Sequence, residues 1–307
     1  MFFEQPVEMQ ALGTKIVDVL EHRYAVEGLN RDTFGLVIVE ETDGGPRGFS
    51  HRGNWRCYPC SLVKAFHLVH ALNAIEEGRI PPHDELDRAM RDMIAWSSNT
   101  ATNYVIDLLT DTTGDTLLAR DDLSEWICKR EELNLFFQRL DWPELAHCNL
   151  TQKLMDDMRY GREAQYAGKD GRNLNALTPL ASARLFYELF AGSVPLGPKG
   201  RLRAHETLHR ERSGPMSEDP HYQVDDFLGG GIPKDVPIWS KAGKNSWTGD
   251  AHASYFKHDV IRFHVPGRNP IILVLMTQGK TVCDDKPEIF PQIGRLIFEL
   301  IEEQRHD

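Results

Sequence analysis

The residues best suited to chemistry are a serine and a lysine three positions apart, Ser61 and Lys64. Residues with this spacing share one face of a helix, so the two side chains are expected to lie together. A lysine withdrawn from water has a lowered pKa and can accept the proton of a serine hydroxyl. Ser61 also follows Pro59 at a predicted helix start, where free backbone N–H groups can bind an oxyanion.

The helix predicted from 61 to about 77 is apolar on nearly every side. Its apolar residues are Leu62, Val63, Ala65, Phe66, Leu68, Val69, Ala71, Leu72, Ala74 and Ile75. A helix of this kind is buried, and an unpaired ammonium inside it is costly. Lys64 therefore either extends to solvent or lies in an internal polar pocket. The alternative to a catalytic pair is an N-cap serine followed by a lysine that reaches solvent.

The same tetrapeptide pattern occurs a second time, at Ser254 and Lys257. That copy falls in a predicted strand, where residues i and i+3 point to opposite faces. The pattern alone is therefore weak evidence, and only the first copy is placed to do chemistry.

Two further polar groups lie where predicted elements meet. Ser97-Ser98-Asn99 interrupts a helical pattern that covers 83–96 and resumes over 101–109, with Asn99 or Thr100 as the expected N-cap. Lys241-Ala242-Gly243 stands at the end of a predicted strand. It is followed by Lys244, Asn245, Ser246, Trp247, Thr248, Gly249 and Asp250.

The elements that must position these groups change in character along the chain. The strands predicted are 33–40, 48–51, 235–242, 250–258 and 270–277. The other helices predicted are 8–22, 122–139, 150–164, 178–190 and 287–304, with a polar loop over 165–176. This order predicts an α/β (α+β) fold with one α/β lobe, residues 1–56 plus 225–307, and an inserted all-helical lobe, residues 57–224.

Composition limits the partners. The 307 residues are 41% hydrophobic and 26% charged, as in a soluble globular protein long enough for two packed lobes. The net charge of −11 argues against nucleic acid or an anionic membrane as the main partner. No apolar run is long enough to span a bilayer, and the first residues lack signal-peptide features, so a cytoplasmic location is expected.

The five cysteines are an odd number and lack the paired spacing of a zinc site. They are Cys57, Cys60, Cys128, Cys148 and Cys283. We expect most of them to be buried free thiols.

The three polar groups, in this order, resemble the S-x-x-K, S-D-N and K-T-G motifs of serine β-lactamases and penicillin-binding proteins. Their surroundings resemble class A β-lactamases in particular. The stretches that carry the resemblance are Tyr58-Pro-Cys-Ser-Leu-Val-Lys64, Trp96-Ser-Ser-Asn-Thr-Ala-Thr-Asn103, Leu177-Thr-Pro-Leu-Ala-Ser-Ala183 and Trp239-Ser-Lys-Ala-Gly243 with Gly249-Asp250. The resemblance implies a five-stranded antiparallel sheet flanked by the N- and C-terminal helices, a small-molecule substrate, and neither cofactor nor metal. It leaves the oligomeric state open.

The resemblance also implies roles for individual residues. Ser61 would be the acylated nucleophile and Lys64 its general base. Ser97 would relay a proton to the leaving group, Asn99 would orient Lys64 or the substrate, and Lys241 would supply positive charge. The backbone N–H groups of Ser61 and Lys244 would form the oxyanion hole. Gly243, Ala242, Asn245 and Trp247 would line the substrate site, although Trp247 packing on the lobe boundary is an equally good interpretation.

The chain departs from the family pattern at three positions. Ser98 replaces the usual aspartate of S-D-N, where little effect is expected because that side chain points away from substrate. Ala242 replaces the hydroxyl residue of K-T-G, which puts penicillin recognition in question; Asn245 or Ser246 could compensate. Glu144 is a candidate deacylation base, but the asparagine expected four residues later is Cys148. The alternative for Glu144 is a solvated loop carboxylate.

Two histidines on the central helix, His67 and His70, have a spacing that metal ligands can use. Packed core histidines are the preferred interpretation.

For the whole chain, the leading hypothesis is a metal-independent serine hydrolase acting through an acyl-enzyme on an amide, lactam or ester. The alternative is a penicillin-binding, ligand-sensing or degenerate homologue that is acylated slowly or not at all.

Overall fold

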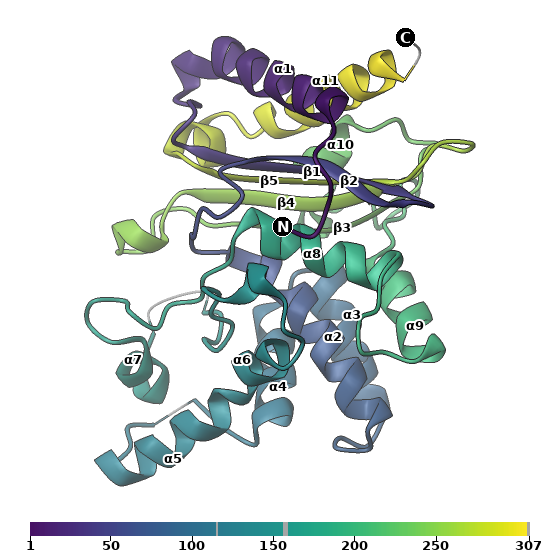
Figure 1. Cartoon of the computed structure of the whole chain (residues 1–307). Coiled ribbons are helices and arrows are strands. Elements are labelled where there is room, and N and C mark those ends of the chain that lie inside the picture. Colours follow the sequence, from purple (N-terminus) through teal and green to yellow (C-terminus); the bar gives the residue numbers. More distant parts are fainter. Residues whose placement is uncertain (115, 156–158, 306–307) are drawn as a thin grey trace.

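A five-stranded antiparallel sheet separates two layers of helices (Figure 1). The computed structural model describes residues 1–114, 116–155 and 159–305. The strands are β1 (Phe34–Thr42), β2 (Gly45–His51), β3 (Ile238–Lys244), β4 (Phe256–Phe263) and β5 (Ile271–Gln278), in the order β2-β1-β5-β4-β3. The central strand β5 is buried on both faces, which explains its continuous apolar sequence. The predicted fold class is confirmed.

One face of the sheet is covered by the two ends of the chain. Helices α1 (Val7–Tyr24) and α11 (Ile289–Gln304) lie side by side over it, together with the short α10 (Leu228–Gly231) (Figure 1). The apolar stripe of α1 packs with that of α11 and with the sheet residues that point to this side. One of the two hydrophobic cores of the protein therefore lies between this face of the sheet and these helices.

The opposite face of the sheet is covered by the helical middle of the chain (Figure 1). Its helices are α2 (Val63–Glu76), α3 (Asp84–Ala95), α4 (Asn99–Thr110), α5 (Arg120–Arg130), α6 (Glu132–Gln138), α7 (Gly161–Ala167), α8 (Pro179–Phe190) and α9 (Pro198–Leu208). Helix α2 is buried almost throughout, as its sequence predicts. Helix α8 begins as predicted, with the Thr178 hydroxyl accepting from the Ala181 N–H and Pro179 in the first turn.

The single helix predicted over 150–164 is wrong for its first part. Residues 150–155 are not helical, and only α7 at the end of that range is; residues 156–158 lie outside the described residues. The backbone N–H of Leu150 donates to Asn134 and that of Gln152 to Asn175. Side chains distant in sequence thus take the hydrogen bonds that a helix would have used.

Other boundaries differ by a few residues. The helix predicted over 122–139 is divided into α5 and α6, and α9 was not predicted. Ser98, rather than Asn99 or Thr100, caps α4, because its hydroxyl accepts from the Ala101 N–H at 3.1 Å. The strand predicted over 250–258 begins only at Phe256, since the Asp250 carboxylate caps a turn by accepting from the His252 N–H.

The predicted two-lobe division at residues 57 and 224 remains a prediction.

Among the described residues, no helix has the length and apolar character needed to cross a membrane.

Candidate active site

Ser61 and Lys64 lie at the entry to the central helix. Ser61 belongs to a 3₁₀ turn, Cys60–Leu62, that continues directly into α2, and Lys64 lies in the first turn of α2. Ser61 is partly exposed, whereas Lys64 is fully buried. Lys64 therefore does not reach solvent, and the alternative in which it does is wrong.

The Lys64 ammonium lies in a pocket of oxygen atoms. Its Nζ donates to Asn99 Oδ1 at 2.8 Å, to Ser97 Oγ at 3.2 Å and to the Ser97 carbonyl oxygen. These acceptors come from the junction between α3 and α4. The sequence-predicted groups at 61–64 and 97–99 are thus brought together by the packing of α4 against α2.

Lys241 reaches the same junction from β3. Its Nζ donates to Ser97 Oγ at 3.0 Å and to Gln223 Oε1 at 3.0 Å. Lys241 is fully buried, and burial, with the nearby charges of Lys64 and Arg210, holds the pKa of its ammonium well below the ordinary value.

The hydroxyl of Ser97 therefore lies between two buried amines. A hydroxyl has one donor and two acceptor sites, so Ser97 Oγ can contact both nitrogens and still pass a proton between them or outward. Burial and the nearby charge of Lys64 both disfavour the protonated form of Lys241, and a neutral amine can accept a proton. This is the chemistry required to activate a neighbouring hydroxyl.

Three residues at or near these contacts have a backbone conformation that residues other than glycine rarely adopt. The φ angle is 50° at Cys60, 54° at Ser97 and 58° at Gln223. Each such residue costs on the order of 1–3 kcal/mol and persists only when the surroundings fix it. Of these strained residues, Cys60 precedes Ser61, Ser97 carries the bridging hydroxyl and Gln223 binds Lys241.

Strand β3 passes directly beside Ser61. A Cβ atom added to Gly243 would lie 2.5 Å from the backbone nitrogen of Ser61, so glycine is required for this approach. Lys244, the next residue, is exposed at the end of the strand. The predicted oxyanion donors thus belong to two segments whose backbones pack together at Gly243.

The other residues predicted to bind substrate lie in different surroundings. Ala242 is fully buried in the core beneath α10 and α11. The side chain of Asn245 bonds the Ala253 carbonyl and the Phe256 N–H, and Ser246 donates to Asp284 at 2.7 Å. Asn245 therefore closes the β3–β4 connection, and Ser246 ties that connection to the segment after β5. Trp247 is 59% exposed, with its ring 6.0 Å from that of Tyr255.

The sequence profile of the β-lactamase enzyme family matches residues 85–301, more than two thirds of the chain. The chain belongs to the β-lactamase enzyme family. A search of curated proteins gives no match.

Solved structures of this family share the fold. The class A β-lactamase of the last common ancestor of Gram-negative bacteria has a TM-score of 0.62 at 20% identity, with coverage of 95% of this chain and 99% of the other. PBP-A has a TM-score of 0.64 at 17% identity, with coverage of 99% of both chains. A variant of the ancestral enzyme was solved with 5(6)-nitrobenzotriazole, at 19% identity, a TM-score of 0.63 and coverage of 94% and 99%. The resemblance inferred from the motifs is confirmed.

In this β-lactamase family member, the ion-pair contacts of Glu144 are with residues other than Lys64 and Lys241. Its carboxylate is buried and lies 3.9 Å from Arg184 and 3.7 Å from the amino group of Met1. It is not the solvated loop carboxylate considered as its alternative. Among the described residues, these contacts of the Glu144 carboxylate do not join it to Ser61, Lys64 or Ser97.

Two residues of the site have no motif in the sequence. Gln223 binds Lys241, but it lies in an irregular segment that no local pattern places. His258 donates from Nε2 to the Tyr58 carbonyl at 2.9 Å and accepts the Thr277 N–H at 3.1 Å, which ties β4 and β5 to the segment before Ser61. Burial lowers the pKa of His258 to about 4, so it remains neutral in this role.

The histidines of α2 and the cysteines show no metal site. The ring of His70 stacks on Phe136 at 4.1 Å, and both His67 and His70 are buried. Within the part of the chain that the structure describes, no group of three or more potential ligands could hold a metal ion. Three of the cysteines, Cys57, Cys60 and Cys283, are buried free thiols.

Proposed function

We propose that the chain is a serine hydrolase that acts through an acyl-enzyme on an amide, lactam or ester bond. The observation that carries the proposal is the position of Ser97 Oγ between the amines of Lys64 and Lys241, at 3.2 and 3.0 Å. Lys64 lies three residues, about one helical turn, after Ser61, whose side chain is partly exposed. This arrangement supplies a base and a proton relay beside a nucleophile.

Acylation would proceed in three proton transfers. Lys64, in its neutral form, takes the proton of the Ser61 hydroxyl while Oγ bonds to the substrate carbonyl carbon. The N–H groups of Ser61 and Lys244 would stabilise the oxyanion. The bond to the leaving group then breaks as Ser97 donates its proton to that group, and Ser97 recovers a proton from Lys64, which returns to its neutral form. Asn99 holds Lys64 in place through its Oδ1.

Deacylation would reverse these roles with water as the nucleophile. Lys64 takes a proton from water, the water oxygen bonds to the acyl carbon, and the proton returns to Ser61 as the ester bond breaks. Glu144 has no part in this proposal, because its ion-pair contacts among the described residues do not reach Ser61, Lys64 or Ser97. The substrate would be a small molecule, and we retain a cytoplasmic location as a prediction.

The test is covalent labelling of wild type and Ser61→Ala by a panel of activated esters and β-lactams, followed by intact-protein mass and turnover. We expect a Ser61-dependent acyl adduct or Ser61-dependent turnover with at least one compound. Turnover that survives in Ser61→Ala would contradict the assignment.

A second candidate function is a penicillin-binding or ligand-sensing protein that is acylated without efficient turnover. It is favoured by Glu144, the candidate deacylation base, because the ion-pair contacts of its carboxylate among the described residues go to Arg184 and Met1 and not to the proposed site. A stable adduct with no product release would support this candidate over the hydrolase.

A further inference from the structure

Arg210 is a fully buried arginine that follows α9 and lies against the edge strand β3. Its backbone N–H donates to the Ile238 carbonyl at 3.0 Å, which ties the start of the irregular segment after α9 to this strand. From that point the side chain reaches the end of α3. Arg210 therefore lies between the two elements that bring Lys241 and Ser97 to the proposed site.

The guanidinium of Arg210 binds both elements at once. On β3, Nη2 donates to the Ser240 carbonyl at 2.9 Å and Nε donates to the Ser240 hydroxyl at 3.1 Å. On α3, Nη2 donates to the Ile94 carbonyl at 3.1 Å and Nη1 to the Ala95 carbonyl at 3.5 Å. A guanidinium is planar and its donors have fixed directions, so these contacts set the position of one element relative to the other.

Both attachment points are close in sequence to the bridging contact of the site. Ser240 immediately precedes Lys241, and Ala95 lies two residues before Ser97. The side chains of Lys241 and Ser97 meet at 3.0 Å, from Nζ to Oγ. Arg210 thus joins the backbone on the two sides of this contact.

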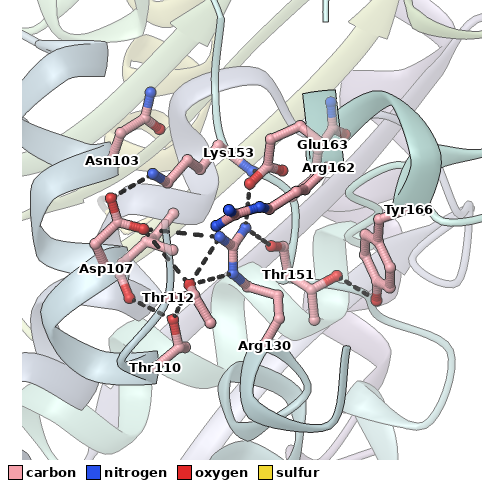
Figure 2. A network of polar contacts seen from close by, with 12 residues as sticks. Asn103, Asp107, Thr110, Thr112, Arg130, Thr151, Lys153, Arg162, Glu163 and Tyr166 are labelled. Carbon is pink, nitrogen blue, oxygen red and sulfur yellow. Dashed lines mark hydrogen bonds and ion pairs between the residues drawn. The ribbon is translucent and has the colours of Figure 1, made fainter. Parts of the chain in front are cut away.

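The partners of Arg210 differ from those of Arg130, which is also fully buried. Arg130 pairs with the Glu163 carboxylate at 2.6 Å, within a network of polar contacts (Figure 2). Among the described residues, the hydrogen-bond acceptors of the Arg210 guanidinium are carbonyls and one hydroxyl. Ile94 and Ala95 belong to the last turn of α3, where carbonyls lack a partner within the helix and the helix dipole favours a cation. Arg210 therefore caps the carboxyl end of α3.

We propose that Arg210 is a positioning residue that sets the contact between Ser97 and Lys241 by joining the end of α3 to β3. In the proposed function, on which this inference rests, Ser97 donates a proton to the leaving group. The placement of Ser97 therefore matters most when the leaving group needs that proton.

The experiment uses two esters of one acid, 4-nitrophenyl phenylacetate and phenyl phenylacetate, with Arg210→Met in the full chain. Nitrophenolate leaves readily as an anion, whereas phenolate is more basic and benefits more from proton donation. For each variant we would measure the melting temperature and, by intact-protein mass, the rate of the acylation that Ser61→Ala lacks.

Arg201→Met is the matched control. The Arg201 guanidinium also donates to carbonyls in the last turn of a helix, those of Glu188 and Leu189 in α8, at 3.1 and 2.8 Å. It thus has the same chemical role at a helix that carries neither Ser97 nor Lys241.

We expect folded Arg210→Met to lose roughly 10- to 100-fold in acylation by the phenyl ester, the size of effect that a misplacement of about 1 Å produces. Acylation by the nitrophenyl ester should fall much less, and Arg201→Met should match wild type with both esters. If Arg210→Met does not fold, Arg210→Lys is the second variant, because it keeps the charge and loses the planar fork. The same preference for the nitrophenyl ester is expected.

A loss no larger for the phenyl ester than for the nitrophenyl ester would overturn the inference, because a general structural defect does not distinguish leaving groups. Unchanged rates in folded Arg210→Met, or an equal loss in Arg201→Met, would also overturn it.

If no compound acylates wild type, the proposed function fails separately, and amide exchange at the end of α3 decides the role of Arg210. The N–H groups of Trp96 and Ser98 both donate to the Asp92 carbonyl, at 3.2 and 3.1 Å. Faster exchange of both in Arg210→Met, but not in Arg201→Met, supports the positioning role. Unchanged exchange in Arg210→Met overturns it.

Discussion

At the scale of single residues, the site depends on where two buried amines meet one hydroxyl. Ser97 has a strained backbone conformation. Its hydroxyl accepts hydrogen bonds from Lys64 on the core helix α2 and from Lys241 on the edge strand β3. Each lysine is deprived of water, so neither charge has its usual stabilisation. Residues in this situation are suited to proton transfer at neutral pH.

Replacement of Lys64 by methionine tests its role as the base. Methionine keeps much of the apolar volume but cannot take a proton. We expect the acylation rate to fall by on the order of 10²- to 10⁴-fold, the usual contribution of general acid–base catalysis. Stopped-flow or mass-based acylation kinetics measure it. Lys257→Met, in the second copy of the pattern, is the control and should acylate at the wild-type rate.

Lys257 suits this comparison because it is also a buried lysine. Its Nζ donates to the Pro287 carbonyl at 3.0 Å and lies 5.0 Å from the centre of the Phe227 ring, in the core beneath α11. Equal losses in Lys64→Met and Lys257→Met would indicate that lysine burial, rather than proton transfer, explains the effect.

At the scale of elements, the site requires that β3 and the turn before α2 approach without a side chain between them. Gly243→Ala places a methyl group 2.5 Å from the Ser61 nitrogen, so the strand or the turn has to move. We expect a loss of about 100-fold in acylation, because a shift of about 1 Å in the reacting groups has that effect. Single-turnover acylation measures it.

Gly44→Ala in the β1–β2 turn is the control for that prediction. A Cβ there would meet nothing closer than 3.7 Å. Wild-type acylation in Gly243→Ala would show that the close approach has no part in catalysis.

The sequence predicted those parts of the site that lie on local patterns. Lys64 could be placed because its helix is apolar all round, and the helix junction at Ser97 because the 3.6-residue pattern stops there. The contact of Gln223 with Lys241 could not be predicted from the sequence, because it depends on the path of an irregular segment. The sequence predicts a helix over 151–154, and this is wrong. The asparagines that bind the backbone at 150–154 are Asn103, Asn134 and Asn175, which are distant in sequence and leave no local pattern.

At the scale of the whole molecule, the sheet separates two cores, and the site lies at the edge of the helical one. That core contains two histidines, and their ring nitrogens have no hydrogen-bond partner among the residues that the structure describes. Burial lowers the pKa of His67 and of His70 to about 3 in each case. Both are therefore neutral in the folded protein at ordinary pH.

These histidines make the folded state sensitive to acid. The unfolded chain binds a proton at each imidazole below about pH 6.5, while the folded chain does so only near pH 3, so the free energy of unfolding falls as pH drops through this window. Between pH 7 and pH 5 we expect a loss of about 2 kcal/mol for each histidine. Urea unfolding at both pH values measures it.

His70→Phe keeps the stacking on Phe136 and removes one titrating group. Its unfolding free energy should therefore change less between pH 7 and pH 5 than that of wild type. An equal pH dependence in the two proteins would contradict the assignment of this effect to His70.

The central claim is that Ser61 is the acylated nucleophile. Its most direct test is peptide mapping of wild type after incubation with benzylpenicillin and with an activated ester, beside Ser61→Ala and Ser254→Ala. The account predicts an acyl group on the peptide that contains Ser61 in wild type and in Ser254→Ala, and none in Ser61→Ala. An adduct on any other residue, or one that persists in Ser61→Ala, would contradict it.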